Sequence, residues 1–151
     1  MSQSLVKNPI HIIWSTKRRH PFLEDQQIQG EMCVFLKGAC DQMDCSAIKI
    51  GGTENHIHVL CHLSKNVTGA KLVGEIKRAS SVWIKTKSPS YCGFFWQGGY
   101  SYFSVRPTDI NVVVKYIANQ KEHHRKIGFK DELRGFLDKY GIHYDEDYLW
   151  D

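Results

Sequence analysis

Hydrophobic residues recur at every second position in two parts of the chain, which is the pattern of half-buried β-strands. The first part, residues 8–17, places three large apolar side chains on one face: Ile10, Ile12 and Trp14. The second part, residues 46–63, has a glycine-rich turn at its centre and predicts a hairpin. The second strand of this hairpin alternates strictly, so one face is apolar and the other carries three histidines: His56, His58 and His62.

Apolar residues recur every three or four positions in three longer segments, which predicts amphipathic helices over residues 24–43, 68–85 and 108–126. Thr108 is the expected N-cap of the third helix. The aromatic stretch at residues 94–105 predicts one or two further strands, and a short helix follows at 131–139. This order predicts an α+β fold in one domain, residues 1–151, with a ferredoxin-like antiparallel sheet and the helices packed on one face.

The composition excludes several classes of protein. With 42% hydrophobic residues and no apolar run of 18 residues, the chain is neither disordered nor membrane-spanning. The N-terminus is too polar for a signal peptide, and the five cysteines include no CxxC pair. We therefore expect a cytoplasmic protein with free thiols.

The net charge of +4 is distributed unevenly along the chain. Residues 1–130 contain 18 Lys and Arg against 9 Asp and Glu, whereas residues 131–151 contain 2 against 7. The positive part indicates an anionic partner. The acidic C-terminal segment, residues 131–151, either packs away from this partner or covers a basic surface until the partner arrives.

Three basic clusters are candidate contacts for nucleic-acid phosphates: Lys17, Arg18 and Arg19; Lys77 and Arg78; Lys121 and Arg125. Four aromatic residues could stack on unpaired bases: Trp96, Tyr100, Tyr102 and Phe103. The alternative is that these residues bind no nucleic acid, because most aromatic residues belong to a core and most charged helix faces are only solvated.

Two pairs of residues could carry chemistry. His56 and His58 share one face of a strand, so their ring nitrogens can converge on a divalent ion. Tyr116 and Gln120 are one turn apart on the third helix, where a phenol nucleophile and an amide ligand could meet. The alternatives are two hydrogen-bonded histidines, and an interfacial tyrosine beside a solvated glutamine.

Together the two pairs favour attack of a tyrosine on a phosphodiester, which keeps the bond energy in a covalent phosphotyrosine. A metal would polarise the scissile phosphate. The sequence contains neither the glycine-rich phosphate loop of nucleotide hydrolases nor the acidic cluster of two-metal nucleases.

The chain resembles the single-tyrosine HUH transposases of the insertion sequence 200/605 group. Five segments carry this resemblance: the opening strand with the following Lys17, Arg18 and Arg19, and residues 55–60, 96–100, 116–124 and 144–150. It implies that His56, His58 and Gln120 hold a divalent metal, with Mg²⁺ as the expected ion and Mn²⁺ as the alternative. Tyr116 would then be the nucleophile, forming a 5′-phosphotyrosine and releasing a 3′-hydroxyl.

The resemblance also implies a homodimer that binds hairpins in single-stranded DNA, in which Tyr116 can complete the active site of the other subunit. Two alternatives remain open at this point. A domesticated nickase would use the same site without moving an element. A hairpin-binding module for DNA or RNA would use the same sheet without cleavage.

Overall fold

The computed structural model describes residues 2–151 and contains one four-stranded antiparallel sheet. The strands lie in the order β2-β3-β1-β4, so the first strand of the chain is central. Their bounds are Pro9–Ser15 for β1, Ala47–Gly52 for β2, His56–His62 for β3 and Ser101–Ser104 for β4. The structure confirms the predicted first strand, the predicted hairpin and the α+β class.

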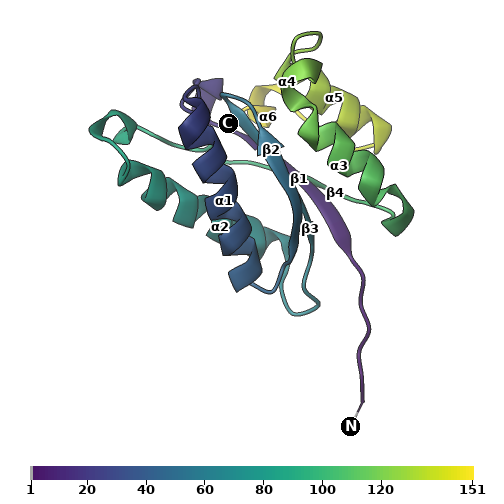
Figure 1. Cartoon of the computed structure of the whole chain (residues 1–151). Helices are drawn as coiled ribbons and strands as arrows, with labels where there is room; N and C mark the ends of the chain where they lie inside the picture. Colours follow the sequence, from purple (N-terminus) through teal and green to yellow (C-terminus); the bar gives the residue numbers. More distant parts are fainter. Residues whose placement is uncertain (1) are drawn as a thin grey trace.

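The helices form two layers, one on each side of the sheet (Figure 1). One layer contains α1 and α2, and the other contains α3, α4 and α5. The helix bounds are Gln26–Gln42 for α1, Gly69–Lys85 for α2, Ile110–Ala118 for α3, Gln120–His123 for α4, Phe129–Lys139 for α5 and Glu146–Leu149 for α6. No helix in residues 2–151 combines the length and the apolarity that crossing a bilayer requires.

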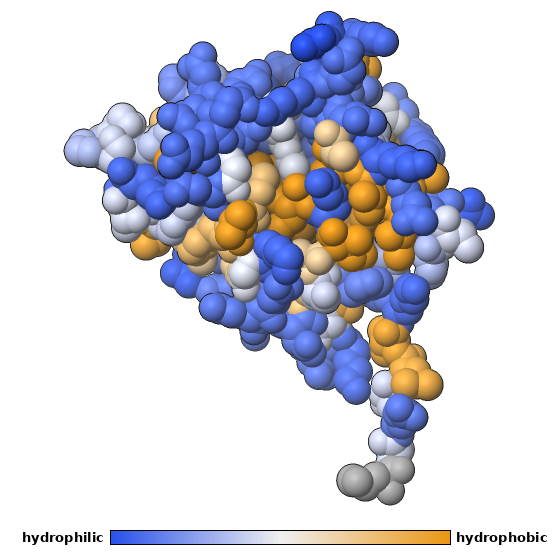
Figure 2. All heavy atoms as spheres, viewed as in Figure 1, coloured by the Kyte–Doolittle hydropathy of each residue, from blue (hydrophilic) through white to orange (hydrophobic). Residues whose placement is uncertain are grey.

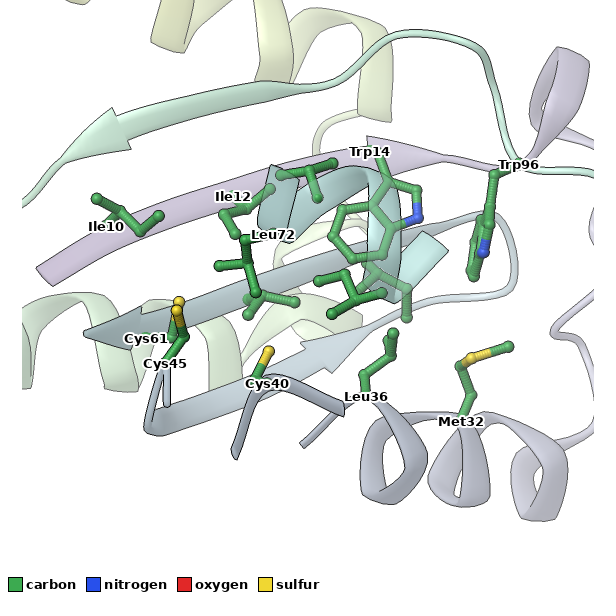
Figure 3. Close-up of a cluster of buried hydrophobic side chains, with 14 of the residues drawn as sticks. Ile10, Ile12, Trp14, Met32, Leu36, Cys40, Cys45, Cys61, Leu72 and Trp96 are labelled. Carbon is green, nitrogen blue, oxygen red and sulfur yellow. The ribbon is translucent and has the colours of Figure 1, made fainter. Parts of the chain in front are cut away.

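The larger core lies between the sheet and the layer of α1 and α2 (Figure 3). Ile10, Ile12 and Trp14 of β1 pack here against Met32 and other residues of α1 and α2. Three buried thiols belong to the same core: Cys40, Cys45 and Cys61. All five cysteines of the chain are free.

The prediction of helices on one face only is wrong, because the second face of the sheet also carries apolar residues. Ile13 packs against Phe129 and Leu133 of α5, and Leu60 packs against Ile117 of α3. Burying these side chains requires a second helix layer. On the side seen in Figure 2, apolar residues show through the centre of a largely hydrophilic surface, over the sheet between the two layers.

The predicted helix over residues 108–126 is divided in the structure. Pro107–Asp109 forms a 3₁₀ turn, and the α-helical hydrogen bonding is interrupted at Asn119, which separates α3 from α4. Thr108 is not the N-cap. Thr108 lies inside the 3₁₀ turn that begins at Pro107, and Asp109 is the N-cap of α3, without a side-chain hydrogen bond.

The aromatic stretch forms one strand, β4, rather than two. Its first part makes only an isolated bridge between Trp96 and Thr16, and Gln97 continues this contact by accepting a hydrogen bond from the Ser15 amide at 2.7 Å. The Trp96 indole is buried and donates to Ser80 Oγ on α2 at 2.9 Å. These contacts attach the loop before β4 to the sheet.

Candidate functional site

His56 and His58 lie on the face of β3 that is turned toward α3 and α5, and both are buried, with 1% and 0% of their surface exposed. Antiparallel pairing sets Ser15 opposite His56 and Ile13 opposite His58. His11, two residues along β1, therefore lies diagonally across from His58, and their ring nitrogens are 2.8 Å apart. The structure thus brings a third, unpredicted histidine to the predicted pair.

His56 has oxygen atoms close to both of its ring nitrogens, and one of them is Thr53 Oγ1, 2.9 Å from Nδ1. Its Nδ1 lies 2.8 Å from Asn55 Oδ1, and its Nε2 lies 3.1 Å from Gln120 Oε1. Burial, and then the neighbouring His58, lower the pKa of His56 from 6.5 to about 3, so the ring is neutral near pH 7. A neutral imidazole has one N–H and cannot donate to both oxygens. A cation near Nε2 would satisfy the lone pairs of both the imidazole and the amide.

His58 is also held from both sides. Its Nδ1 faces His11 Nε2, and its Nε2 lies 3.1 Å from Glu132 Oε1. Burial, and then His58, lower the pKa of His11 to about 3, which keeps His11 neutral. Such a partner on the far nitrogen fixes the tautomer and orientation of a metal-binding histidine.

Tyr116 reaches this cluster from α3. Its hydroxyl donates a hydrogen bond to Glu132 Oε2, and its ring centroid lies 5.8 Å from that of His58. Burial, and then the bond with Glu132, raise the pKa of Tyr116 above its ordinary value, so the phenol is protonated at neutral pH. Tyr116 and the histidine pair therefore meet within a single chain.

Glu132, on α5, is a central member of the cluster and was not predicted from the sequence. It is 4% exposed. Its carboxylate contacts six side chains: His56, His58, Tyr116, Gln120, His123 and His124. Burial by itself would raise the pKa of Glu132, but hydrogen bonds from His124 and His58 hold it below the ordinary range. The carboxylate is therefore ionised.

Four of these residues offer ligand atoms that all lie within 4.8 Å of one another: His56, His58, His124 and Glu132. Imidazole nitrogens and a carboxylate oxygen form a donor set suited to a divalent metal. Gln120 Oε1, 3.0 Å from His124 Nε2, borders the same space. The residues present therefore fit a metal; the group of four includes the predicted His56 and His58, and the predicted Gln120 lies beside it.

A cavity of about 930 Å³ lies between α3 and α5 and leads to this cluster. Its lining includes Tyr116, Glu132, His11 and His123 from the cluster, together with the basic residues Arg106 and Lys139. An extended substrate could therefore approach the Tyr116 hydroxyl through this cavity, whereas His56 and His58 are not among the lining residues.

The candidate phosphate contacts are dispersed, and several already contact residues of their own chain. Lys77 donates to the carbonyl oxygens of Gln97 (2.7 Å) and Gly99 (2.9 Å), and burial lowers its pKa to about 8. Five others lie exposed: Lys17, Arg18, Arg78, Lys121 and Arg125. Arg78 forms an ion pair with Glu75 on the same helix, and Arg125, which follows α4, forms one with Glu122 of α4.

The end of the acidic C-terminal segment lies against the loop before β4. The Asp151 carbonyl accepts a hydrogen bond from the Gly99 amide at 3.0 Å. Trp150 lies beside a partly buried cation, with 5.5 Å from the Arg19 guanidinium carbon to its ring centroid. One basic residue of the predicted phosphate contacts is therefore covered by this segment.

Three residues of the site were missed, His11, His124 and Glu132, and the sequence carried a signal for His11 and Glu132. Glu132 borders the apolar stripe of α5, which contains Phe129, Leu133 and Phe136, and an acidic residue in that position is seldom buried without a partner. His11 stands between two isoleucines in a strand with two buried faces. Both are polar residues at core positions.

No curated protein sequence matches this chain. A solved structure of a Deinococcus radiodurans R1 protein assigned as a transposase is 22% identical, covers 80% of this chain and 96% of its own, and superposes with a TM-score of 0.61. A REP-associated tyrosine transposase bound to a REP hairpin is 16% identical, with 84% and 76% covered and a TM-score of 0.61. Residues 4–120, which include His56, His58, Tyr116 and Gln120, match the sequence family described as "Transposase IS200 like", and the chain belongs to this family of transposases.

Proposed function

We propose that this protein is a metal-dependent transposase that cleaves and rejoins single-stranded DNA with Tyr116 as the nucleophile. One observation carries the proposal: the Tyr116 hydroxyl faces a buried cluster of histidines and a carboxylate, at the end of a cavity that opens to solvent. A tyrosine beside a metal site is the arrangement that phosphodiester cleavage through a covalent intermediate requires.

The metal would be held by His56 and His58, with Gln120 as the third ligand that the family resemblance implies. A divalent cation bound there would polarise the scissile phosphate and offset the charge that develops on it. Mg²⁺ is the proposed ion, and the imidazole donors also suit Mn²⁺.

In the cleavage step, the Tyr116 hydroxyl oxygen bonds to phosphorus while the bond from phosphorus to the 3′-oxygen breaks. The products are a 5′-phosphotyrosine and a free 3′-hydroxyl. The Tyr116 hydroxyl already donates to Glu132 Oε2, so the proton that it must lose has an acceptor in place. Attack of a 3′-hydroxyl on the phosphotyrosine reverses the step and rejoins the strands.

The proposed DNA partner is a hairpin in single-stranded DNA, as in the structural relative that was solved with a REP hairpin. Seven side chains are proposed to contact its phosphates: Lys17, Arg18, Arg19, Lys77, Arg78, Lys121 and Arg125. A homodimer is also proposed. Within the single chain, the Tyr116 ring centroid lies 5.8 Å from that of His58, which supports cleavage by one subunit; completion of the active site of the other subunit is the alternative.

The decisive test is covalent capture of DNA. Wild-type protein is incubated with a stem-loop single-stranded oligonucleotide from its own locus, with Mg²⁺, with Mn²⁺ and with EDTA. We expect an adduct that survives denaturing electrophoresis with either metal and disappears with EDTA. Tyr116→Phe should form none, whereas Tyr148→Phe, a change of the same kind at a residue 74% exposed on α6, should behave as wild type.

A second arm separates cleavage from binding. His56→Ala should abolish the adduct and leave hairpin binding largely intact, because the imidazole is buried away from the basic surface. Hairpin binding by wild type without any adduct, on a substrate that a related transposase cleaves, would instead identify a binding module.

A further inference from the structure

Glu132 is a buried carboxylate that forms no ion pair with a lysine or arginine of the described residues. Within residues 2–151, its ion-pair partners are all histidines: His56, His58, His123 and His124. Buried carboxylates are normally matched by lysine or arginine, or they coordinate a metal. The surroundings of Glu132 are therefore those of a carboxylate that coordinates a metal ion.

The two carboxylate oxygens face different groups. Oε1 points to the predicted metal ligands, with His58 Nε2 at 3.1 Å and His56 Nε2 at 3.7 Å. Oε2 accepts the hydrogen bond of the Tyr116 hydroxyl and lies 3.3 Å from Gln120 Nε2. One rigid group therefore spans the space between the proposed metal and the proposed nucleophile.

We propose that Glu132 is itself a metal ligand of this site, through Oε1, and that it positions Tyr116 beside the metal through Oε2. This inference rests on the proposed function, which supplies the roles of the metal and of Tyr116, and it adds an anionic ligand to a set of neutral ones. A carboxylate binds a divalent cation more strongly than an amide does, because it brings a full negative charge.

The positions of the donors favour Glu132 over a purely neutral set. His56 and His58 approach from β3, Gln120 from α4, and Glu132 from α5, so three separate elements supply donors to the same space. Hydrogen bonds to the outer oxygen of a metal-bound carboxylate fix its orientation, and here Tyr116 and Gln120 supply them. Metal and nucleophile would then be held at a constant separation.

The first test is Mn²⁺ binding, which needs no DNA and no activity. Free Mn²⁺ is measured by electron paramagnetic resonance during titration of wild type, Glu132→Gln and Glu31→Gln. Glu132→Gln keeps the size of the side chain, and we expect it to weaken Mn²⁺ binding about 10- to 100-fold. Glu31→Gln, on α1 and paired with Lys87, should bind as wild type. Wild-type affinity in Glu132→Gln would overturn the inference.

A second measurement uses wild type alone and decides the question if Glu132→Gln does not fold. Crystals soaked in Mn²⁺ should show an anomalous-difference peak within bonding distance of His56, His58 and Glu132. A peak bonded to His56, His58 and Gln120, with the Glu132 carboxylate outside bonding distance, would overturn the inference.

The two proposals fail in different ways. A metal-dependent adduct through Tyr116, together with unchanged Mn²⁺ affinity in Glu132→Gln, would overturn the role of Glu132 and support the proposed function. Loss of Mn²⁺ affinity in Glu132→Gln, without an adduct in wild type, would support the ligand role and contradict the proposed function.

Discussion

Gly51 controls how closely α3, which carries the proposed nucleophile Tyr116, approaches the sheet. It lies on β2, and a Cβ built on it would be 2.9 Å from Ile117 Cγ2 and 3.1 Å from the Ile117 carbonyl oxygen. Ile117 is buried and follows Tyr116 directly on α3. A methyl group at residue 51 therefore requires α3 to move outward by a few tenths of an ångström, because a backbone carbonyl cannot rotate away.

The cost of Gly51→Ala should appear mainly at the nucleophile. Overpacking of this kind costs about 1–3 kcal/mol. The larger core of α1 and α2 lies on the opposite face of the sheet and is not touched. If the strain displaces Tyr116 from its position beside Glu132, the same free energy corresponds to a roughly 5- to 160-fold slower reaction.

The assay is the initial rate of covalent adduct formation at saturating metal, together with the free energy of unfolding in urea. Gly38→Ala is the matched control. It lies within α1 with no atom near its Cβ position, and it should stabilise the protein by about 0.5–1 kcal/mol at an unchanged rate. A Gly51→Ala protein with wild-type rate and wild-type stability would refute the reasoning, since α3 would then not depend on this close approach.

Two further predictions concern stability. Burial lowers the pKa of His11 and His56 to about 3 in the folded protein, against 6.5 in the unfolded chain. Between these pH values the unfolded chain binds more protons, so the free energy of unfolding falls as the pH drops below 6.5, by about 2 kcal/mol for each histidine at pH 5. Equal free energies of unfolding at pH 5 and pH 7.5 in EDTA would contradict this. Ser80→Ala leaves the buried Trp96 N–H without its acceptor and should lower the free energy of unfolding by about 1–3 kcal/mol in urea titrations, whereas Ser81→Ala should change it by less than about 0.5 kcal/mol.

Local patterns were sufficient to predict the elements of the fold. Alternation along residues 56–63 identified β3 and placed His56 and His58 on one face, because a strand allows only two directions for its side chains. The 3.6-residue period identified α1 and α2 almost to their ends. The family match over residues 4–120 confirms the resemblance that rested on these elements and on the Tyr116 segment.

Contacts between distant segments were not predictable in this way. His11 meets His58 only because of the register of β1 against β3, which the sequence of either strand does not specify. Glu132 meets His58 across 74 residues of chain, through the docking of α5 on the sheet. The break at Asn119 also depends on packing, because the residues around it have no strong preference against a helix.

The sequence-based prediction placed all helices on one face of the sheet and missed His124 and Glu132, and these two errors have one physical cause. Placing all helices on one face left the second face of the sheet uncovered, and with it the side of β3 that carries His56 and His58. The segment that covers this face, α4 to α5, also brings His124 and Glu132 to the histidine pair. Buried imidazoles on a sheet need polar partners from the layer above them, because an unpaired polar group in a core is costly. Two histidines on the inner face of a strand therefore predict both a covering helix layer and the further polar residues that this layer must contribute.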